Sequence, residues 1–562
     1  MANALASLIS LVTSARAVNR VPETHTNRAG GQSYWRSLKE QVIQVLTTGT
    51  LGDTYYCTGQ QLAQEAVEVL LKAREECPDF FARALVYARN VGMMKTLPVL
   101  GLVVLSGGRK NRKLTEAVFD QVVRIPDDLR AFVALCRTKS VPGRDGFGGY
   151  VVQLVRRKLT QMSEYHVLKY GSSASDTITL CDILRLSHAK PIDPAQSERF
   201  AWLVNGDNAL GTDPTLNPQI QALASLKRAV TEDEKLNLIR EGKLPFEVVV
   251  PTLQGTSPKI WEALLYNAPY MNLLWSLATF ARHGVFQSEA NVRYAVQRLI
   301  NPQAVERSRV LPFRFFNAWK VYSESEGSRM EIADALRQAM ELSFVNMPTL
   351  GERTVAIGAD TSGSMCGTYS ERSSTRFIDI AGIFTGALLK RIEGRAIALP
   401  FDTEVHVPNQ LSARDDILVT AEKLSRYGGG GTAVGSPIEH LLRSNSKVDV
   451  FVGITDSEDW AYGRGYRCSG SFYELWLRYR EVVNPDAKAF LVTIAPYRDA
   501  LVPDGVEGVH FISGWSDRVL NYIGLTLEGG ENQIQAIEQM ELDVGGRAND
   551  STETDNEEHA EE

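Results

Sequence analysis

The stretch RTVAIGADTSGSM, residues 353–365, marks the place where the pattern of this chain changes. A short apolar run ends there in an aspartate, and two serines follow at alternate positions. Further short apolar runs lie at 395–402, 447–456, 487–496 and 508–513, with helical segments such as RFIDIAGIFTGALLKRIEG between them. Strands that alternate with helices predict a parallel sheet covered on both faces, which binds ligands at the carboxyl ends of its strands.

The preceding part of the chain, residues 32–346, is predicted to be almost entirely helical. Apolar residues recur at helical spacing in segments such as GQQLAQEAVEVLLKAREE and MNLLWSLATFAR, and short breakers such as IPDD and NPQ separate them. No strict repeat period is found in the sequence, so irregular HEAT-like helix pairs fit best. Such arrays curve and offer a concave surface to large ligands. We therefore expect helical repeats in residues 1–350, an α/β domain in residues 351–530 and a C-terminal extension in residues 531–562.

Length and composition set broad limits on the class of protein. A chain of 562 residues suggests two to four domains, and 44% hydrophobic with 23% charged residues is typical of a soluble globular protein. No apolar run reaches membrane-spanning length, and the N-terminal apolar patch lacks the basic start of a signal peptide. The six cysteines form no CxxC pair, which argues against a structural zinc site and a secreted disulfide framework. The sequence therefore favours a cytoplasmic protein.

The net charge is a property of the C-terminal end rather than of the folded body. Residues 548–562 contain seven acidic residues and no Lys or Arg, and the formal net charge of the whole chain is −7. Residues 1–547 therefore carry no net charge. A polar, acidic segment without apolar periodicity is predicted to be a disordered, solubilising tail. A neutral body can still carry a basic patch, so composition does not exclude nucleic acid as a ligand.

Oxygen-bearing side chains follow the strands at the predicted carboxyl edge of the sheet. Asp360 ends the first strand and begins a D-x-S-x-S pattern with Ser362 and Ser364. Thr432 lies in a glycine-rich loop before a helix, and Asp456 ends a later strand. Carboxylates and hydroxyls are hard oxygen donors, which suit Mg²⁺ or a similar ion rather than zinc. These five residues predict a divalent-cation site that water or a partner's carboxylate completes.

Other interpretations of the same loop have less support. Asp and Ser often cap helices and fill turns, but capping does not require Thr432 and Asp456 to stand at strand ends as well. A nucleophilic serine lacks the G-x-S-x-G elbow, and neither His406 nor His440 has an obvious partner role. The GGGG run is no phosphate-binding loop, since no G-K-[ST] follows it. A metal-dependent hydrolase would need a general base near Asp360, and none is indicated, so we expect no catalytic activity.

The three parts of this pattern together resemble a von Willebrand factor A (vWA) domain with a metal-ion-dependent adhesion site. The resemblance covers roughly residues 351–530 and implies a Rossmann-like fold. It also implies that a divalent cation, which we take to be Mg²⁺, is bound directly or through water by the same five residues: Asp360, Ser362, Ser364, Thr432 and Asp456.

Residues 137–190 combine basic side chains with aromatic rings. Lys and Arg hold backbone phosphates, while aromatic and histidine rings stack on unpaired bases. The candidate RNA-binding residues of this stretch are Arg137, Lys139, Arg144, Arg156, Arg157, Lys158, Lys169, Arg185 and His188. The rings interleaved with them belong to Tyr150, Tyr165, His166 and Tyr170. A solvated helix face and a structural histidine are equally good explanations of single residues, and helical arrays are more often protein scaffolds.

The segment DILRLSHAKP, residues 182–191, is similar to the TROVE module of Ro ribonucleoproteins. It stands in a helical region that a vWA-like domain follows, which is the domain order of that family. Further similar segments are NRAGGQSYW (27–35), GTLGDTYY (49–56), VVRIP (122–126) and WEALLYNAPYMNLLWSLATF (261–280). The resemblance spans nearly all of residues 25–530, and we take the chain for a bacterial or phage member.

The resemblance implies an α plus α/β architecture in which a ring of HEAT-like repeats within one chain is closed by the vWA domain. Ro proteins bind small noncoding Y RNAs on the outer surface of the ring and single-stranded ends of misfolded RNAs in its hole. In bacteria the family is linked to RNA quality control and to a 3′ exoribonuclease partner. By motif, Lys169 and His188 are the best RNA candidates, with Arg185 beside them.

One departure from the family pattern concerns the strength of RNA binding. The small polar residues GSSASDT follow Lys169 and Tyr170, where other members carry more basic residues. This puts in question how strongly Y RNA binds at this edge, and less so RNA binding as such. The alternative function is a protein-interaction scaffold that uses the vWA metal site alone, with an idle helical ring.

Overall fold

The structure is a computed structural model in which most of the chain is described. The described residues are 24–47, 57–138, 146–171, 178–253, 257–347, 349–368, 375–495, 497, 499–503, 506–514, 518–527 and 533–542. The expectations for residues 1–23, for the motif at 49–56 and for the acidic tail lie outside these residues.

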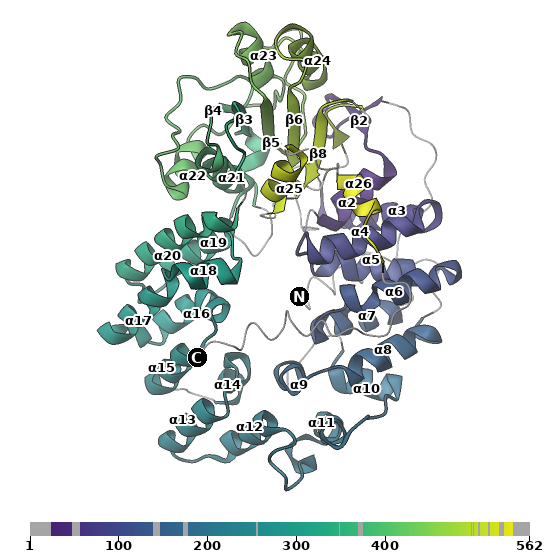
Figure 1. The fold of residues 1–562 in the computed structure, drawn as a ribbon, viewed down its shortest axis with the longest axis vertical. Helices are drawn as coiled ribbons and strands as arrows, with labels where there is room; N and C mark the ends of the chain where they lie inside the picture. Colours follow the sequence, from purple (N-terminus) through teal and green to yellow (C-terminus); the bar gives the residue numbers. More distant parts are fainter. Residues whose placement is uncertain are drawn as a thin grey trace.

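The helical part is a curved two-layer array (Figure 1). Its helices are α2 (Leu38–Thr47), α3 (Gly59–Glu76), α4 (Pro78–Asn90), α5 (Thr96–Ser106), α6 (Arg112–Val122), α7 (Pro126–Arg137), α8 (Tyr150–Thr160), α9 (Glu164–Gly171), α10 (Leu180–Ser187), α11 (Pro194–Asn205), α12 (Pro218–Arg228), α13 (Glu232–Glu241), α14 (Phe246–Thr252), α15 (Pro258–Asn267), α16 (Tyr270–Arg282), α17 (Glu289–Leu299), α18 (Pro302–Ser308), α19 (Pro312–Ser323) and α20 (Met330–Leu342). Helices two apart in sequence pack on each other, as α4 on α6 and α5 on α7. Repeated pairs of this kind give the HEAT-like array that the sequence predicts.

Local sequence explains where these helices begin and how closely they pack. Helix α3 begins with a capping box, in which Thr58 and Gln61 each bond the other's backbone N–H. Helix α5 is apolar on all sides because it lies inside the array, where it contacts α3, α4 and α7. Gly101 of α5 permits this packing, since a Cβ there would lie 2.4 Å from Leu85 Cδ2.

A buried ion pair joins successive helix pairs at α4 and α7. Arg89 Nη2 donates to Asp128 Oδ2 at 2.7 Å, and its Nε donates to the Val122 carbonyl at 3.1 Å. The same Asp128 oxygen accepts the backbone N–H groups of Arg124 and Ile125 at the start of α7. The ion pair therefore fixes the start of α7 and holds α7 against α4.

Replacing Asp128 by alanine is expected to lower the free energy of unfolding by about 3–5 kcal/mol, because Arg89 would remain buried without its charge partner. Denaturant titration measures the change. The matched control is Glu422→Ala, which removes one partner of the exposed pair with Arg426 and should cost less than about 0.5 kcal/mol. Equal small effects in the two variants would contradict the structural role given to Asp128.

The α/β domain contains a five-stranded parallel sheet in the order β4-β3-β5-β6-β8. Its elements are β3 (Val355–Asp360), α21 (Phe377–Arg391), β4 (Ala396–Phe401), α22 (Ile417–Ser425), α23 (Ser436–Arg443), β5 (Val450–Thr455), α24 (Phe472–Val482), β6 (Lys488–Thr493), β8 (Val509–Ser513) and α25 (Arg518–Leu527). A strand occurs at each of the five predicted places. Alternate residues of β3 face different layers: Val355 and Ile357 share a core with α21 and α22, whereas Ala356 packs with α23 and α24.

The last helices of the array pack directly on one face of this domain. Helix α19 contacts α21, and the core of the array continues without a break into the layer of α21 and α22. Lys320 pairs with Asp379 at 3.4 Å, and Arg337 pairs with Asp416. The junction near residue 350 is therefore a packed interface rather than a free linker.

The first helices of the array meet the same domain from the other side. Strands β1 (Thr24–Thr26) and β2 (Gln32–Trp35) form a small antiparallel sheet with β7 (Asp499–Ala500), and α2 packs on β8. Helix α26 (Gln533–Glu538) returns from the C-terminal extension to pack on α4. Both ends of the array thus join the α/β domain, and the elements form a closed ring (Figure 1).

The small sheet is the main feature of the fold that sequence patterns did not predict. Its strands have three, four and two residues, which is too short for alternation to be recognised. Residues 24–35, which fall within the first predicted part of the chain, pair with a strand of the second. Among the described helices, none is both long enough and apolar enough to cross a membrane.

Candidate functional site

Asp360 and the two serines after it form a buried loop at the carboxyl edge of the sheet. Asp360 Oδ1 accepts the Ser362 N–H at 2.8 Å, and its Oδ2 accepts the Thr455 hydroxyl at 2.6 Å. The hydroxyls of Ser362 and Ser364 lie 3.2 Å apart. A short 3-10 turn, η6 (Gly363–Cys366), carries Ser364 back toward the strand end. The D-x-S-x-S pattern therefore gathers one carboxylate and two hydroxyls.

Two further loops bring Thr432 and Asp456 to the same edge. In the parallel register Ala359 faces Ile454, so the strand ends that precede Asp456 and contain Asp360 lie side by side. The glycine-rich loop bonds to the first loop, with Gly363 N–H donating to the Gly430 carbonyl at 2.9 Å. All five predicted ligands are at most 5% exposed. The structure thus brings together Asp360, Ser362, Ser364, Thr432 and Asp456.

The glycine run before Thr432 is required by space. A Cβ on Gly430 would lie 2.5 Å from Asp402 Oδ2, and one on Gly431 would lie 2.6 Å from a ring carbon of Trp460. The carbonyl of Thr432 accepts the N–H groups of Trp460 and Ala461 at 3.0 and 2.9 Å. The glycine-rich loop therefore packs tightly between Asp402 and Trp460, and this packing holds Thr432 in place.

The electrostatics of the site favour a cation. Burial raises the pKa of Asp360, and the charge of Asp456 raises it further. Burial also raises the pKa of Asp456, against a hydrogen bond from Ser364 that lowers it. Two buried carboxylates repel each other unless a positive charge lies between them. Two carboxylates and three hydroxyls fit a hard divalent cation such as Mg²⁺.

The proposed metal centre depends on the hydroxyl groups of Ser362, Ser364 and Thr432 as well as on its two carboxylates. Within the described part of the chain, no group of three or more His, Cys, Asp and Glu side chains is arranged to hold a metal ion. A zinc-type site is thus absent from these residues, and the oxygen-only set at the sheet edge is the candidate metal centre.

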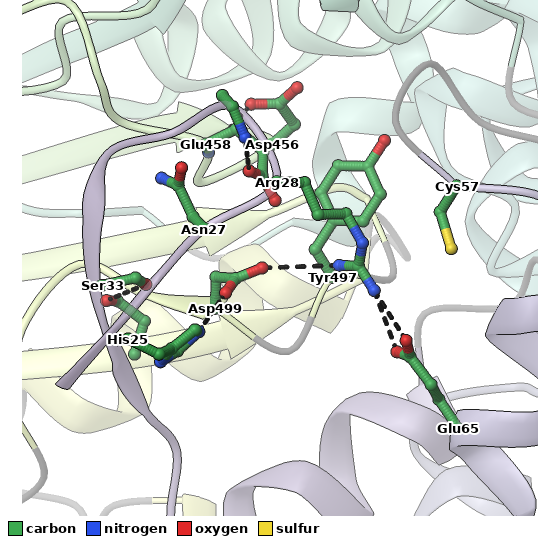
Figure 2. Close-up of polar contacts among 12 residues, drawn as sticks. His25, Asn27, Arg28, Ser33, Cys57, Glu65, Asp456, Glu458, Tyr497 and Asp499 are labelled. Carbon is green, nitrogen blue, oxygen red and sulfur yellow. Dashed lines mark hydrogen bonds and ion pairs between the residues drawn. The ribbon is translucent and has the colours of Figure 1, made fainter. Parts of the chain in front are cut away.

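A second polar cluster lies where the first described residues, from Thr24 on, meet the α/β domain (Figure 2). Arg28 donates two hydrogen bonds to Glu65 of α3, at 2.9 and 3.0 Å, and lies 3.4 Å from Asp499. Its guanidinium stands over the ring of Tyr497 at 5.0 Å, and His25 bonds Asp499 at 2.5 Å. Burial would raise the pKa of Asp499, but the bond from His25 and the charge of Arg28 hold it below its usual range.

Four of the predicted RNA-binding residues form one exposed cluster on α7, α8 and α10. Arg156 Nε donates to the Ser187 carbonyl at 2.5 Å, which places Arg156 beside His188. The charges of Arg137 and Arg185 both act on Asp182 at the start of α10. We call Arg137, Arg156, Arg185 and His188 the basic cluster; all four are exposed. Within the described residues, none of its three arginines forms an ion pair.

His188 owes its position to the end of helix α10. It is the C-cap residue, with φ 52° in the left-handed region, and its N–H donates to the Leu184 carbonyl. A left-handed C-cap turns the chain sharply and leaves the side chain outside the helix. The imidazole is therefore presented next to Arg156 at the helix end.

Other predicted RNA-binding residues are already engaged. Lys169 pairs with Glu247 of α14 at 2.7 Å and lies over the rings of Tyr165 and Tyr170. Burial would lower the pKa of Lys169, but the hydrogen bond to Glu247 and the nearby phenols raise it above its usual value. Arg157 pairs with Asp120 at 2.7 Å.

The remaining candidates are Lys158, Lys139 and Arg144. Lys158 is half-buried and has an interaction of its own. Lys139 and Arg144 lie outside the described residues. The structure therefore groups four of the predicted RNA-binding residues in the basic cluster, whereas Lys169 and Arg157 each pair with a carboxylate.

Sequence patterns did not indicate several residues that shape these sites. Thr455 bonds Asp360 directly, yet it precedes Asp456 in a strand and looks like an ordinary β-branched residue. Arg28, Glu65 and Asp499 meet across more than 400 residues of chain. No local spacing connects them, so only the resemblance at 27–35 singled out this region.

A curved array of helix pairs, closed at both ends by an α/β domain with oxygen donors at its sheet edge, defines a ring protein with a vWA-like domain. Residues 248–351 match the TROVE domain, and residues 354–520 match the Ro60 vWA domain. The chain thus contains a TROVE domain and a Ro60 vWA domain, in the order that the sequence resemblance predicts.

Relatives of known name support this assignment over most of the chain. The RNA-binding protein RO60 of Deinococcus radiodurans is 26% identical over 459 residues, which cover 77% of this chain and 83% of the relative. The RNA-binding protein RO60 of Caenorhabditis elegans is 26% identical over 585 residues, 88% of each chain. The crystal structure of the Deinococcus radiodurans RO (RSR) protein matches with a TM-score of 0.66 at 19% identity, covering 87% of this chain and 99% of that one. The predicted fold class is confirmed.

Proposed function

We propose that this protein binds RNA without catalysing a reaction on it, and that the basic cluster on α7, α8 and α10 is a principal contact. The observation that carries this proposal is the exposure of three arginines without ion pairs among the described residues, beside an exposed histidine. Arginine holds phosphates through paired N–H groups, and histidine stacks on unpaired bases. Two relatives that are named as RNA-binding proteins support the RNA-binding part of this proposal.

The RNA ligands are those that the Ro resemblance implies. We propose small noncoding RNA, Y-like in type, on the outer surface and single-stranded ends of misfolded RNA within the ring, in a pathway of RNA quality control. A 3′ exoribonuclease is the proposed protein partner. The short polar segment after Tyr170 predicts weaker Y-RNA binding than in relatives with basic residues there.

Co-purified nucleic acid tests the proposal first. The protein purified at low salt should carry RNA, seen as a raised ratio of absorbance at 260 nm to that at 280 nm, and sequencing should recover short noncoding transcripts. A preparation free of nucleic acid, with no binding of short single-stranded RNA at low salt, would exclude RNA binding. The alternative function, a metal-dependent protein-interaction scaffold, would then be favoured by the buried oxygen site.

We propose further that the candidate metal centre holds Mg²⁺ or a similar divalent cation. Asp360 and Asp456 would supply the charge, and Ser362, Ser364 and Thr432 would supply neutral oxygens. A bound cation would serve as a docking point whose shell an acidic side chain of a partner completes.

A substitution of Lys169 distinguishes a structural role of its ion pair with Glu247 from a role in RNA contact. Lys169→Met should lower the free energy of unfolding by about 1–2 kcal/mol, because Glu247 Oε1 would lose its partner while Oε2 has none to begin with. RNA affinity should fall by less than about threefold, since the ammonium group is already neutralised. The double variant with Glu247→Gln should recover most of the lost stability. A large loss of RNA affinity at unchanged stability would show instead that the ion pair opens to RNA.

A further inference from the structure

The first described residues of the chain contact the loop that follows the candidate metal ligand Asp456. We call residues 24–36 the strap. Asn27 Nδ2 donates to the Asp459 carbonyl at 2.9 Å, and Ala29 N–H donates to Glu458 Oε2 at 3.1 Å. These contacts cross more than 400 residues of chain. Figure 2 shows the neighbourhood, with Asn27 and Arg28 of the strap near Asp456 and Glu458.

The strap fits this loop too closely to tolerate a side chain at Gly31. A Cβ there would lie 1.9 Å from the Asp459 carbonyl oxygen and 2.9 Å from Trp460 Cα. The turn of the strap is itself fixed, since Asn27 Oδ1 accepts the Gly31 N–H at 2.7 Å. Backbone lies against backbone at this point, so neither segment can move far without the other.

Hydrogen bonds continue from this contact into the candidate metal centre. Glu458 N–H donates to Asp456 Oδ1 at 3.2 Å, and Ser457 N–H donates to Thr455 Oγ1, which in turn bonds Asp360. Ser457 has φ 68°, a left-handed conformation that a non-glycine residue adopts only when its surroundings enforce it. The loop therefore depends on its contacts for the shape that presents Asp456.

Arg36 provides a second connection between the strap and this loop. Arg36 Nη2 donates to Thr493 Oγ1 at 2.9 Å, and the same Thr493 hydroxyl lies 2.9 Å from Ser457 Oγ. Arg36 is 3% exposed, and its guanidinium lies over the ring of Phe511 at 4.8 Å. A buried arginine held this firmly fixes the end of the strap to the sheet below the loop.

The other side of the strap is fastened to the helical array. Arg28 joins Glu65 of α3 to Asp499 of the small sheet, as described above. The strap therefore touches the loop of Asp456 with one side and the first helix pairs with the other. A ligand that fixes the loop of Asp456 would therefore also favour closure of the ring between the strap and the first helix pairs.

We propose that the strap is a positioning element of the divalent-cation site, so that cation binding and docking of the strap stabilise each other. A cation between Asp360 and Asp456 fixes the loop in the shape that Gly31 fits, and the docked strap holds Asp456 ready for the cation. The proposal rests on the proposed cation site. By thermodynamic linkage, the cation must favour docking of the strap by the same factor by which the docked strap raises cation affinity.

Substitution at Gly31 tests the proposal without altering a metal ligand. Gly31→Ala in the full chain should weaken Mn²⁺ binding, measured by paramagnetic resonance, by about tenfold or more. The matched control is Gly148→Ala, where a Cβ meets nothing within 4 Å and the backbone has ordinary φ; its Mn²⁺ affinity should equal that of the unaltered protein. Equal affinities in all three proteins would overturn the proposal.

Hydrogen exchange on the unaltered protein provides a test that does not depend on the folding of a variant. Mn²⁺ should slow exchange in peptides that cover residues 24–36 and leave peptides of α12 unchanged. In Asp360→Asn the slowing should disappear. Absence of Mn²⁺ binding in the unaltered protein would reject the proposed cation site itself. Binding without slower exchange in the strap would reject only the coupling.

Discussion

Asp360→Asn abolishes high-affinity divalent-cation binding while the protein remains folded; this is the expected result with the largest effect on the vWA domain. The substitution keeps the shape of the side chain and one acceptor oxygen for the Ser362 N–H. It removes one of the two negative charges at the site, so affinity for Mn²⁺ or Mg²⁺ should fall by about 100-fold or more. Isothermal titration of the full chain measures this decrease in affinity.

Thermal stability gives an independent readout of the same substitution. A cation at 100 times its dissociation constant should stabilise the unaltered protein by about 2.7 kcal/mol and raise its melting temperature. Asp360→Asn should show no such rise. Without cation its melting temperature should be no lower than that of the unaltered protein, because repulsion between Asp360 and Asp456 is removed. The control Glu422→Gln changes an exposed carboxylate of the same domain and should bind the cation normally; a normal response in Asp360→Asn would contradict the site.

The second large effect is expected from the arginines of the basic cluster. The triple variant Arg137→Ala, Arg156→Ala and Arg185→Ala should bind RNA more weakly, on the order of 100-fold, since each charge-assisted hydrogen bond to a phosphate contributes about 1 kcal/mol or more. The slope of log affinity against log salt should also become shallower, by about 0.7 for each phosphate of single-stranded RNA that the variant no longer neutralises. Fluorescence anisotropy with labelled RNA measures both quantities.

A control of equal charge separates the basic cluster from a general effect of net charge. Arg426, Arg443 and Arg467 are exposed arginines of the α/β domain, each paired with a carboxylate. Their triple substitution by alanine removes the same three charges and should leave RNA affinity within a few fold. Equal decreases in affinity in the two triple variants would mean that long-range charge, rather than the cluster, governs binding.

The meeting of the proposed cation ligands could be predicted from sequence because strand order and register place them at one edge of the sheet. Each parallel strand ends at the same edge, so Asp360 and Asp456 are neighbours once β3 and β5 pair. The glycine run before Thr432 was also visible, although its reason, lack of space against Asp402 and Trp460, was not. The hydrogen bond from Thr455 to Asp360 could not be foreseen, because a threonine inside a strand looks like any other β-branched residue.

The ion-pair partners of the basic residues in 137–190 could not be predicted from sequence. Composition treats Lys169 and Arg185 alike, but Lys169 pairs with Glu247, which lies 78 residues away on another repeat. Whether a basic side chain is free to bind a phosphate depends on such distant carboxylates, and a single sequence does not reveal them. The strap is a similar case, since its partners near residues 458 and 499 become neighbours only when the ring closes.

Titration of short single-stranded RNA into the full-length protein tests RNA binding by the basic cluster most directly. At low salt we expect saturable binding, a linear fall of log affinity with log salt, and loss of that binding in the triple arginine variant of the basic cluster. If the unaltered protein bound no RNA at low salt, or bound it as tightly after removal of the Arg137, Arg156 and Arg185 side chains, the proposed RNA-binding function of this surface would be contradicted.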